Sequence, residues 1–296
     1  MPHLPITAEG CQWRHAGTAA SLDDTLAALP EDQPVVILIH GYRYRPGHPR
    51  CDPHRLILSR DAGLGASDLS WPHHLGISDD QGALSIGFGW NGFGTLRQAR
   101  DEAGRAGLAL AALIRRIRIL SPGRRVNIMA HSLGAKVLLS ALPALEPGDI
   151  ARAVLLFPAL LARETAAAAT LRASAGMEVI RVTSRENLLF DLIGAALAAG
   201  GWDGPVSPRV TGALPGWTDL PIDCAATLAH LATEGFPIAT RQRRVCHWSS
   251  YLRPGIFALY RALLTAPDPL PLAALAPPLS AGAEGWAETA GAFATT

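Results

Sequence analysis

The stretch Val126-Asn127-Ile128-Met129-Ala130-His131-Ser132-Leu133-Gly134-Ala135-Lys136-Val137 decides how this chain folds. A mostly apolar run leads into Ala-His-Ser-Leu-Gly, and a helical pattern of Ala, Lys and Leu follows at once. This order is typical of a nucleophile elbow, a sharp strand-to-helix turn that exposes a serine hydroxyl. The two backbones pass close together at such a turn, so small residues are needed two positions either side of the serine. Ala130 and Gly134 meet that need.

Composition and charge set the broad class of the protein. The chain has 296 residues, of which 49% are hydrophobic and 17% charged, with a net charge of +1. Such a chain is globular and long enough to bury a sizeable core. Nothing in the overall charge directs it to nucleic acid or to an anionic membrane. The first residues lack a basic and apolar leader, and no apolar run reaches about 18 residues, so we expect a cytoplasmic protein with no transmembrane segment.

Apolar runs and helical patterns alternate along most of the chain. Runs typical of buried strands lie at 34–39, 83–90, 126–131, 150–157 and 177–183. Helical patterns lie at about 21–29, 95–121, 162–174, 188–199 and 223–233, and one more begins at Pro254. This alternation predicts an α/β fold with a mostly parallel, doubly wound sheet flanked by helices. We expect a single domain over 1–265 and a loosely ordered Ala/Pro-rich tail over 266–296.

Two irregular segments interrupt this pattern, an excursion at 43–80 and an insertion at 200–240. The excursion contains several histidines, but none stands at a zinc-finger or His-Glu-x-x-His spacing, so we expect no metal. Residues 87–92 match Gly-x-Gly-x-x-Gly, yet the next strand leads into Ser132 and not into the carboxylate that a dinucleotide site requires. We therefore expect no cofactor. The four cysteines form no Cys-x-x-Cys pair and are expected to be reduced.

Candidate catalytic residues fall where predicted strands end. A serine hydroxyl needs a base to take its proton, and a histidine base is held by an acid. The chain order serine, acid, histidine is that of α/β-hydrolase triads. His230 and His247 are the two histidines after both Ser132 and the candidate acids, and His247, the last of the ten, is the one we choose. Glu186, just past the 177–183 strand, is our first choice for the acid and Asp191 the alternative, while Asn187 is uncharged and could only orient the ring.

Backbone donors for a developing oxyanion can also be placed from the sequence. The elbow supplies the N–H of Leu133, and the loop after the 34–39 strand supplies a second, most simply that of Tyr42. Gly41 allows the backbone to approach closely there, because it has no Cβ.

At these positions the chain resembles the α/β-hydrolases, nearest to a bacterial group of unknown function that is similar to lipases and esterases. The resemblance covers roughly 33–265 and rests on Ile39-His40-Gly41-Tyr42, Phe88-Gly89-Trp90, Ala130-His131-Ser132-Leu133-Gly134, Thr183-Ser184-Arg185-Glu186-Asn187 and His247-Trp248-Ser249. Ala130 replaces the usual glycine, and relatives often carry aspartate where Asn187 stands.

The resemblance implies a serine hydrolase of esterase or lipase type that works through an acyl-enzyme on Ser132, without a cofactor. Its substrate would be a small carboxylic ester, with thioesters and amides also open. The residues expected to contact the substrate are Gly41, Trp90, His131 and Trp248. The alternative is a non-catalytic binding protein that keeps the hydrolase fold. The sequence leaves the oligomeric state and the natural substrate open.

Overall fold

One sheet organises the molecule. In the computed structural model, which describes residues 2–17, 21–61, 69–76, 83–198, 214–266 and 269–275, eight strands form this sheet in the order β2-β1-β4-β3-β5-β6-β7-β8. The strands are β1 (His3–Glu9), β2 (Gln12–His15), β3 (Val35–Ile39), β4 (Leu84–Gly89), β5 (Val126–His131), β6 (Arg152–Leu156), β7 (Glu178–Thr183) and β8 (Trp217–Pro221). Only β1 and β2 pair antiparallel, and all other neighbours are parallel.

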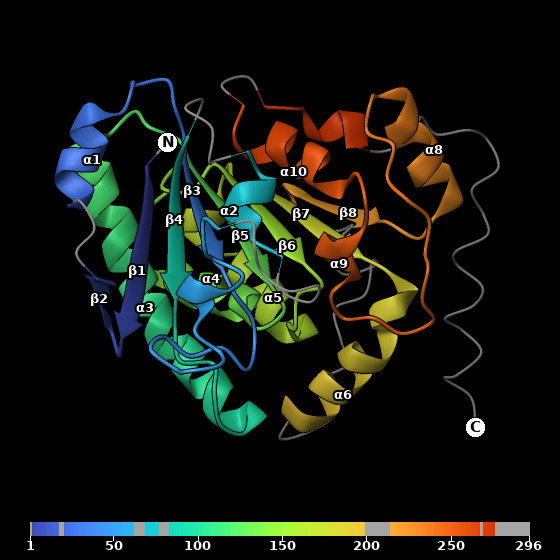
Figure 1. Cartoon of the computed structure of the whole chain (residues 1–296), viewed down its shortest axis with the longest axis horizontal. Helices are drawn as coiled ribbons and strands as arrows, with labels where there is room; N and C mark the ends of the chain where they lie inside the picture. The colour runs from blue at the N-terminus through green and yellow to red at the C-terminus, as the bar shows by residue number, and fades with distance from the viewer. Residues whose placement is uncertain are drawn as a thin grey trace.

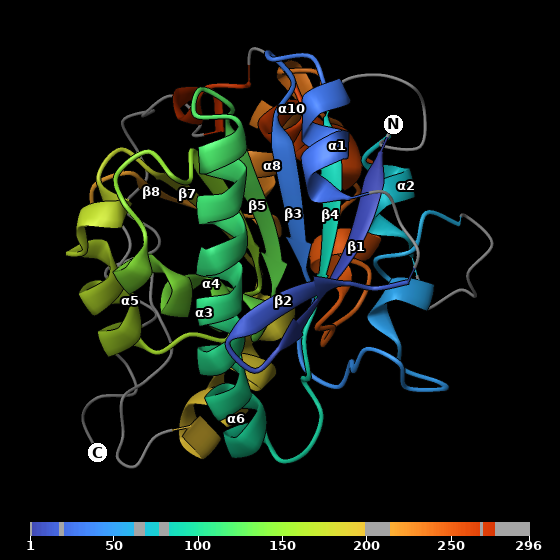
Figure 2. The ribbon, with the colours of Figure 1, turned by 90° about the vertical axis from the view of Figure 1, so that its left-hand side faces the viewer.

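Helices cover both faces of the sheet (Figures 1 and 2). One face packs against α1 (Leu22–Ala28), α3 (Leu96–Leu120), α4 (Gly134–Ala141) and α5 (Ala162–Ala169). The other face packs against α2 (Trp71–His74), α8 (Ala225–Thr233), α9 (Ser249–Leu252) and α10 (Ile256–Leu264). Alternate residues of β3 explain the two cores: Val35, Ile37 and Ile39 join the first cluster, whereas Val36 and Leu38 join the second. A strand buried on both faces has to be apolar throughout.

Helix α6 (Leu188–Ala198) lies apart from these two layers. It follows β7 through the short 3-10 helix η4 (Arg185–Asn187) and lies beyond the carboxyl ends of the strands (Figures 1 and 2). Ligands of open parallel sheets bind at this edge, because the loops that follow the strands converge there. The edge is therefore where the candidate residues should meet.

Most of the predicted elements are present. All five predicted strands form, and Ser21 caps α1 by accepting a hydrogen bond from the Asp24 N–H, as its position before the helical pattern predicts. The helix predicted at 162–174 is shorter, ending at Ala169. The β1–β2 hairpin was not predicted, since both strands carry only a weak apolar pattern and β2 is the edge strand of the sheet.

The two irregular segments differ from expectation in part. The predicted insertion at 200–240 contains β8, which pairs with β7 as part of the sheet, while 199–213 lies outside the described residues. The excursion contains α2 and the 3-10 helix η1 (Pro53–Arg55), and 62–68 and 77–82 lie outside the described residues. Of the predicted tail, the 3-10 helix η5 (Leu272–Leu275) packs on the core through the buried Leu275, and 276–296 is not described. Among the described helices, none is long and apolar enough to cross a bilayer.

Candidate active site

Ser132 lies on a strained turn between β5 and α4. Its φ is +53°, a left-handed value that non-glycine residues adopt at a cost, and such strain collects at functional sites. The turn is tight because Gly134 passes the end of β3: a Cβ at Gly134 would lie 2.6 Å from the carbonyl oxygen of His40. Ala130 is fully buried. The geometry of the predicted elbow is therefore present, with alanine filling the first small position.

His247 contacts the hydroxyl of Ser132 directly. Its Nε2 lies 2.8 Å from Ser132 Oγ, although 115 positions separate the two residues in sequence. Its Nδ1 lies 2.6 Å from Oδ1 of Asn187, an atom that can only accept a hydrogen bond. Nδ1 therefore carries the proton, and the Nε2 lone pair faces the serine. Burial lowers the pKa of His247 from 6.5 to about 4, so the imidazole is neutral at pH 7 and able to take a proton.

Glu186, our first choice for the acid, has different partners. Its carboxylate is 1% exposed, pairs with Arg253 and accepts hydrogen bonds from the Ser249 and Ser184 hydroxyls. Consecutive side chains of a 3-10 helix point about 120° apart, so in η4 only one of Glu186 and Asn187 can face His247. Asn187 faces it. The sequence signal is Arg253, the only charged residue in 248–260, since a charge in so apolar a stretch calls for a buried carboxylate.

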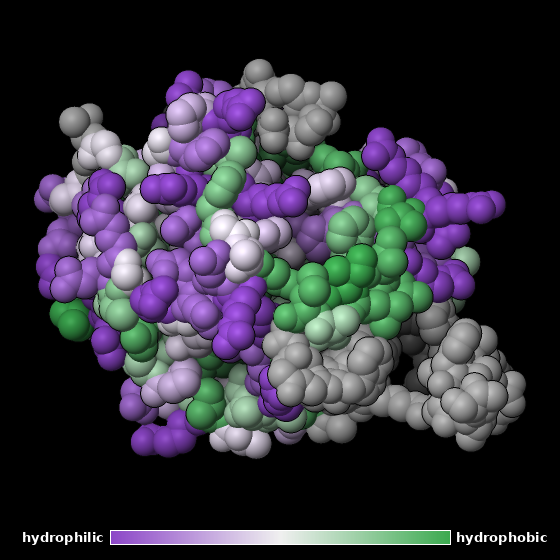
Figure 3. All heavy atoms as spheres, turned by 90° about the horizontal axis from the view of Figure 1, so that it is seen from below, coloured by the Kyte–Doolittle hydropathy of each residue, from purple (hydrophilic) through white to green (hydrophobic). Residues whose placement is uncertain are grey.

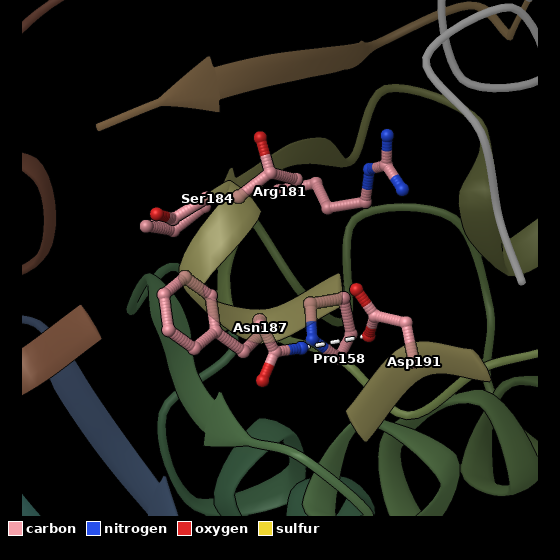
Figure 4. A pocket seen from close by; sticks show the side chains of 8 residues that line it. Pro158, Arg181, Ser184, Asn187 and Asp191 are labelled. Carbon is pink, nitrogen blue, oxygen red and sulfur yellow. Dashed lines mark hydrogen bonds between the residues drawn. The ribbon is translucent and has the colours of Figure 1, made fainter. Parts of the chain in front are cut away.

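Asp191, the alternative acid, lies behind Asn187. Asn187 Nδ2 donates to Asp191 Oδ1 at 2.7 Å (Figure 4). This bond fixes the amide so that its oxygen points at His247. Burial raises the Asp191 pKa from 3.8 to about 7, against the opposing effect of Arg181. Arg181 itself forms a two-pronged pair with Asp219. Ser132, His247, Asn187 and Asp191 thus form one chain of hydrogen bonds.

A pocket opens beside Asp191, at the end of this chain of hydrogen bonds. The residues that line it are Phe157, Pro158, Arg181, Val182, Thr183, Ser184, Asn187 and Asp191 (Figure 4). Neither Ser132 nor His247 belongs to this lining, so the pocket gives access to Asp191 and not to the serine.

The loop after β3 lies against the serine as predicted. A Cβ on Gly41 would lie 3.0 Å from Ser132 Cβ, which is tighter than an ordinary contact, so the absence of a Cβ eases this close approach. Among the described residues, the N–H groups of Leu133 and Tyr42 donate to no backbone carbonyl. Both are therefore free to serve as oxyanion donors, whereas the Tyr42 hydroxyl is occupied by the Gly94 carbonyl at 2.6 Å.

His40 and Trp90 hold this loop in place. The two rings stack at 5.4 Å, His40 Nε2 accepts from the Trp90 N–H, and Trp90 Nε1 donates to the His40 carbonyl. Trp90 is fully buried, and its predicted contact with the substrate stays a prediction. His131 is also buried and contacts the His247 carbonyl through Nε2, so it supports the base. Trp248 is 48% exposed and stays available to a substrate.

Phe190 is a neighbour of the site that the sequence did not indicate. Its ring stacks on His247 at 4.7 Å and remains 36% exposed. It lies three residues after Asn187 on an almost wholly apolar helix, where sequence alone assigns a phenylalanine to the core.

The histidines of the excursion have structural partners. His54 Nε2 lies 3.0 Å from Thr7 Oγ1, and His48 Nδ1 accepts from the Arg50 and Cys51 N–H groups. In the part of the chain that the structure describes, no three His, Cys, Asp or Glu side chains are grouped to hold a metal ion.

The sheet, its helical layers and the serine elbow between β5 and α4 define an α/β-hydrolase fold. Residues 17–158 match the model of a family described as "Alpha/beta hydrolase of unknown function (DUF900)", which confirms the resemblance seen in the motifs. No curated protein matches the chain in sequence.

Two solved structures are similar to the chain at low identity. One is Trichoderma reesei cutinase in complex with a C11Y4 phosphonate inhibitor, with 17% identity, a TM-score of 0.31, and coverage of 63% of this chain and 75% of that chain. The other is an acetylxylan esterase, with 11% identity, a TM-score of 0.32, and coverage of 64% and 83%. Similarities this weak do not tell what the chain acts on.

The buried pair of Glu186 and Arg253 should stabilise the fold strongly. Arg253→Met leaves a carboxylate buried without its cation, and we expect the free energy of unfolding to fall by about 3–5 kcal/mol. Urea denaturation followed by circular dichroism measures this. Arg14→Met is the matched control, because its pair with Glu9 is more than half exposed on both sides and is worth about 1 kcal/mol at most. If the free energy of unfolding fell equally in the two variants, the pair of Glu186 and Arg253 would not be the stabilising contact proposed here.

Proposed function

We propose that the chain is a serine hydrolase that cleaves carboxylic esters through an acyl-enzyme on Ser132. The observation that supports this most is the 2.8 Å contact between Ser132 Oγ and His247 Nε2. A neutral imidazole at that distance can take the hydroxyl proton as the oxygen attacks. The strained backbone at Ser132 adds support, because the turn directs the hydroxyl out of the strand.

The reaction would run in two half-reactions, the formation of the acyl-enzyme and its hydrolysis. Ser132 Oγ attacks the ester carbonyl carbon while its proton moves to His247 Nε2, and the Leu133 and Tyr42 N–H groups stabilise the oxyanion. The C–O bond then breaks, and the alcohol leaves with the proton from His247. A water molecule attacks the acyl-enzyme in the same way, with His247 again taking the proton, and the carboxylic acid leaves as Ser132 is restored. Thioesters and amides would follow the same steps.

Asn187 takes the place of the usual carboxylate in this proposal. Its Oδ1 holds Nδ1–H of His247 and so keeps the imidazole in the tautomer that can accept from serine. Triads with histidine held by asparagine occur in other hydrolytic enzymes. The exposed rings of Phe190 and Trp248 flank His247 and favour an apolar acyl or aryl group in the substrate.

One observation favours the alternative, a non-catalytic binding protein with this fold. Among the described residues no carboxylate contacts His247, so the imidazolium would lack a direct counter-charge. Labelling with a fluorophosphonate decides between the two. We expect Ser132 of the intact protein to displace fluoride from the reagent, so that the protein carries one phosphonyl group, which peptide mass spectrometry maps to Ser132. Heat-denatured protein should stay unlabelled. Unlabelled native protein would support the binding protein.

A further inference from the structure

Helix α6 carries an exposed apolar surface beside the candidate site. Six of its large apolar side chains are 36–63% exposed, and two residues of the 241–248 segment add to them. The eight residues, here named the α6 surface, are Leu188, Leu189, Phe190, Leu192, Ile193, Leu197, Val245 and Trp248. Figure 3, which views the molecule from the side of α6, shows a continuous apolar area with hydrophilic side chains at its edge.

The polarity of α6 is the reverse of that expected for a helix in water. Its one charged residue, Asp191, points inward to Asn187, while the leucines and isoleucine point outward. A helix that is apolar all round belongs in a core or in a membrane. With 11 residues, α6 is far shorter than the roughly 20 needed to span a bilayer. It is suited to lie in the plane of an interface.

Arginines border this surface. Arg241, Arg243 and Arg244 are exposed, and among the described residues none of their guanidinium groups pairs with a carboxylate. The segment that carries them runs beside the start of α6, since the Cys246 N–H donates to the Glu186 carbonyl at 3.0 Å. Guanidinium groups bind phosphate oxygens with two parallel hydrogen bonds. The net charge of +1 hides this local cluster, which is why composition did not indicate it.

We propose that the α6 surface and these three arginines dock onto an anionic lipid surface, with α6 lying among the headgroups. Apolar side chains would enter the acyl boundary, Trp248 would sit at headgroup level, and the arginines would bind lipid phosphates. A second copy of the chain fits less well, because a two-fold contact through this surface would gather the arginines of both copies around one interface. Docking would bring lipid next to His247, whose ring lies 4.7 Å from that of Phe190.

Vesicle co-sedimentation of the full chain tests this. We expect binding to phosphatidylcholine vesicles that contain phosphatidylglycerol, weaker binding to phosphatidylcholine alone, and loss of binding as salt rises. Leu189→Ser and Ile193→Ser should each weaken binding about tenfold. Arg243→Glu and Arg244→Glu should each weaken it about fivefold or more. Ile119→Ser is the matched control, because Ile119 is 71% exposed on α3, away from this surface.

Several outcomes would overturn the proposal. The wild-type protein could fail to bind mixed vesicles, or Ile119→Ser could weaken binding as much as Ile193→Ser. A dimer in light scattering that Leu189→Ser dissociates would assign the surface to a second copy instead. Circular dichroism verifies that each variant is folded. The test is independent of catalysis, since Ser132→Ala should bind vesicles as the wild type does whether or not the chain hydrolyses esters.

Discussion

Replacing Ser132 with alanine should lower kcat/KM for an activated ester such as p-nitrophenyl acetate by about 10⁶-fold. The methyl group removes the nucleophile, and what remains comes from the oxyanion donors and substrate binding alone. His247→Gln should cost about as much, because the hydroxyl then has no base at 2.8 Å. Since the two residues act as a unit, the double variant should be no slower than either single one. Initial rates measured from released nitrophenolate give all three values.

Ser140→Ala is the matched control for this prediction. It makes the same substitution eight positions further on, within α4, and we expect its rate to stay within about twofold of the wild type because Ser140 contacts none of the reacting groups. If Ser132→Ala keeps its rate within tenfold of the wild type, the esterase activity arises elsewhere and the proposed role of Ser132 fails.

The central strands of the sheet could be predicted from the sequence because strands that are buried on both faces are mostly apolar. β3, β5 and β6 are buried on both faces, so β3 appears as an uninterrupted apolar run and the other two as mostly apolar runs, and β5 leads directly into the serine turn. β8 was not predicted as a strand. Its run Trp217–Pro221 is only partly buried and includes Asp219, whose carboxylate is held by Arg181 from the neighbouring strand. A cross-strand pair of that kind cannot be recognised before the pairing is known.

The sequence predicts the pair of Ser132 and His247, but it does not predict that Asn187 is the residue that holds the imidazole. Chain order leaves two histidines, His230 and His247, because both follow the candidate acids, and the His247-Trp248-Ser249 motif selects His247. Chain order cannot tell which of the adjacent residues Glu186 and Asn187 faces His247, because this depends on the direction that η4 gives each side chain. That direction depends on Arg253, which binds the carboxylate of Glu186 from 67 positions away. A long-range ion pair thus decided the outcome.

Asn187→Ala should lower kcat/KM by about 10²-fold, since it removes the acceptor that holds His247 Nδ1–H but leaves serine and base in place. Asn187→Asp is the conservative variant and should restore most of the rate below pH 7, because one carboxylate oxygen accepts the same hydrogen bond and the protonated Asp191 can donate to the other. Steady-state kinetics on both variants measure this. If the two variants were equally slow, Asn187 would serve the packing of η4 and not the orientation of the imidazole.

Asp191 should add a pH dependence that Asp191→Asn abolishes. As the pH rises, kcat/KM should first rise near 4, where His247 loses its proton, and again near 7, where Asp191 ionises. The ionised carboxylate accepts a stronger hydrogen bond from Asn187 Nδ2, which makes Oδ1 a better acceptor for His247. In Asp191→Asn only the lower step should remain. A second rise near 7 that survives this substitution would remove Asp191 from the mechanism.

Asp191→Asn, which should slow the reaction near pH 8, should raise the free energy of unfolding at that pH. Burial raises the Asp191 pKa from 3.8 to about 7, so the folded chain holds a proton that the unfolded chain releases between those values. The free energy of unfolding of the wild type therefore falls as the pH rises across this window. Asp191→Asn removes that fall and should be more stable than the wild type at pH 8, as measured by urea denaturation. A side chain whose removal stabilises the fold and slows the reaction would be retained for function.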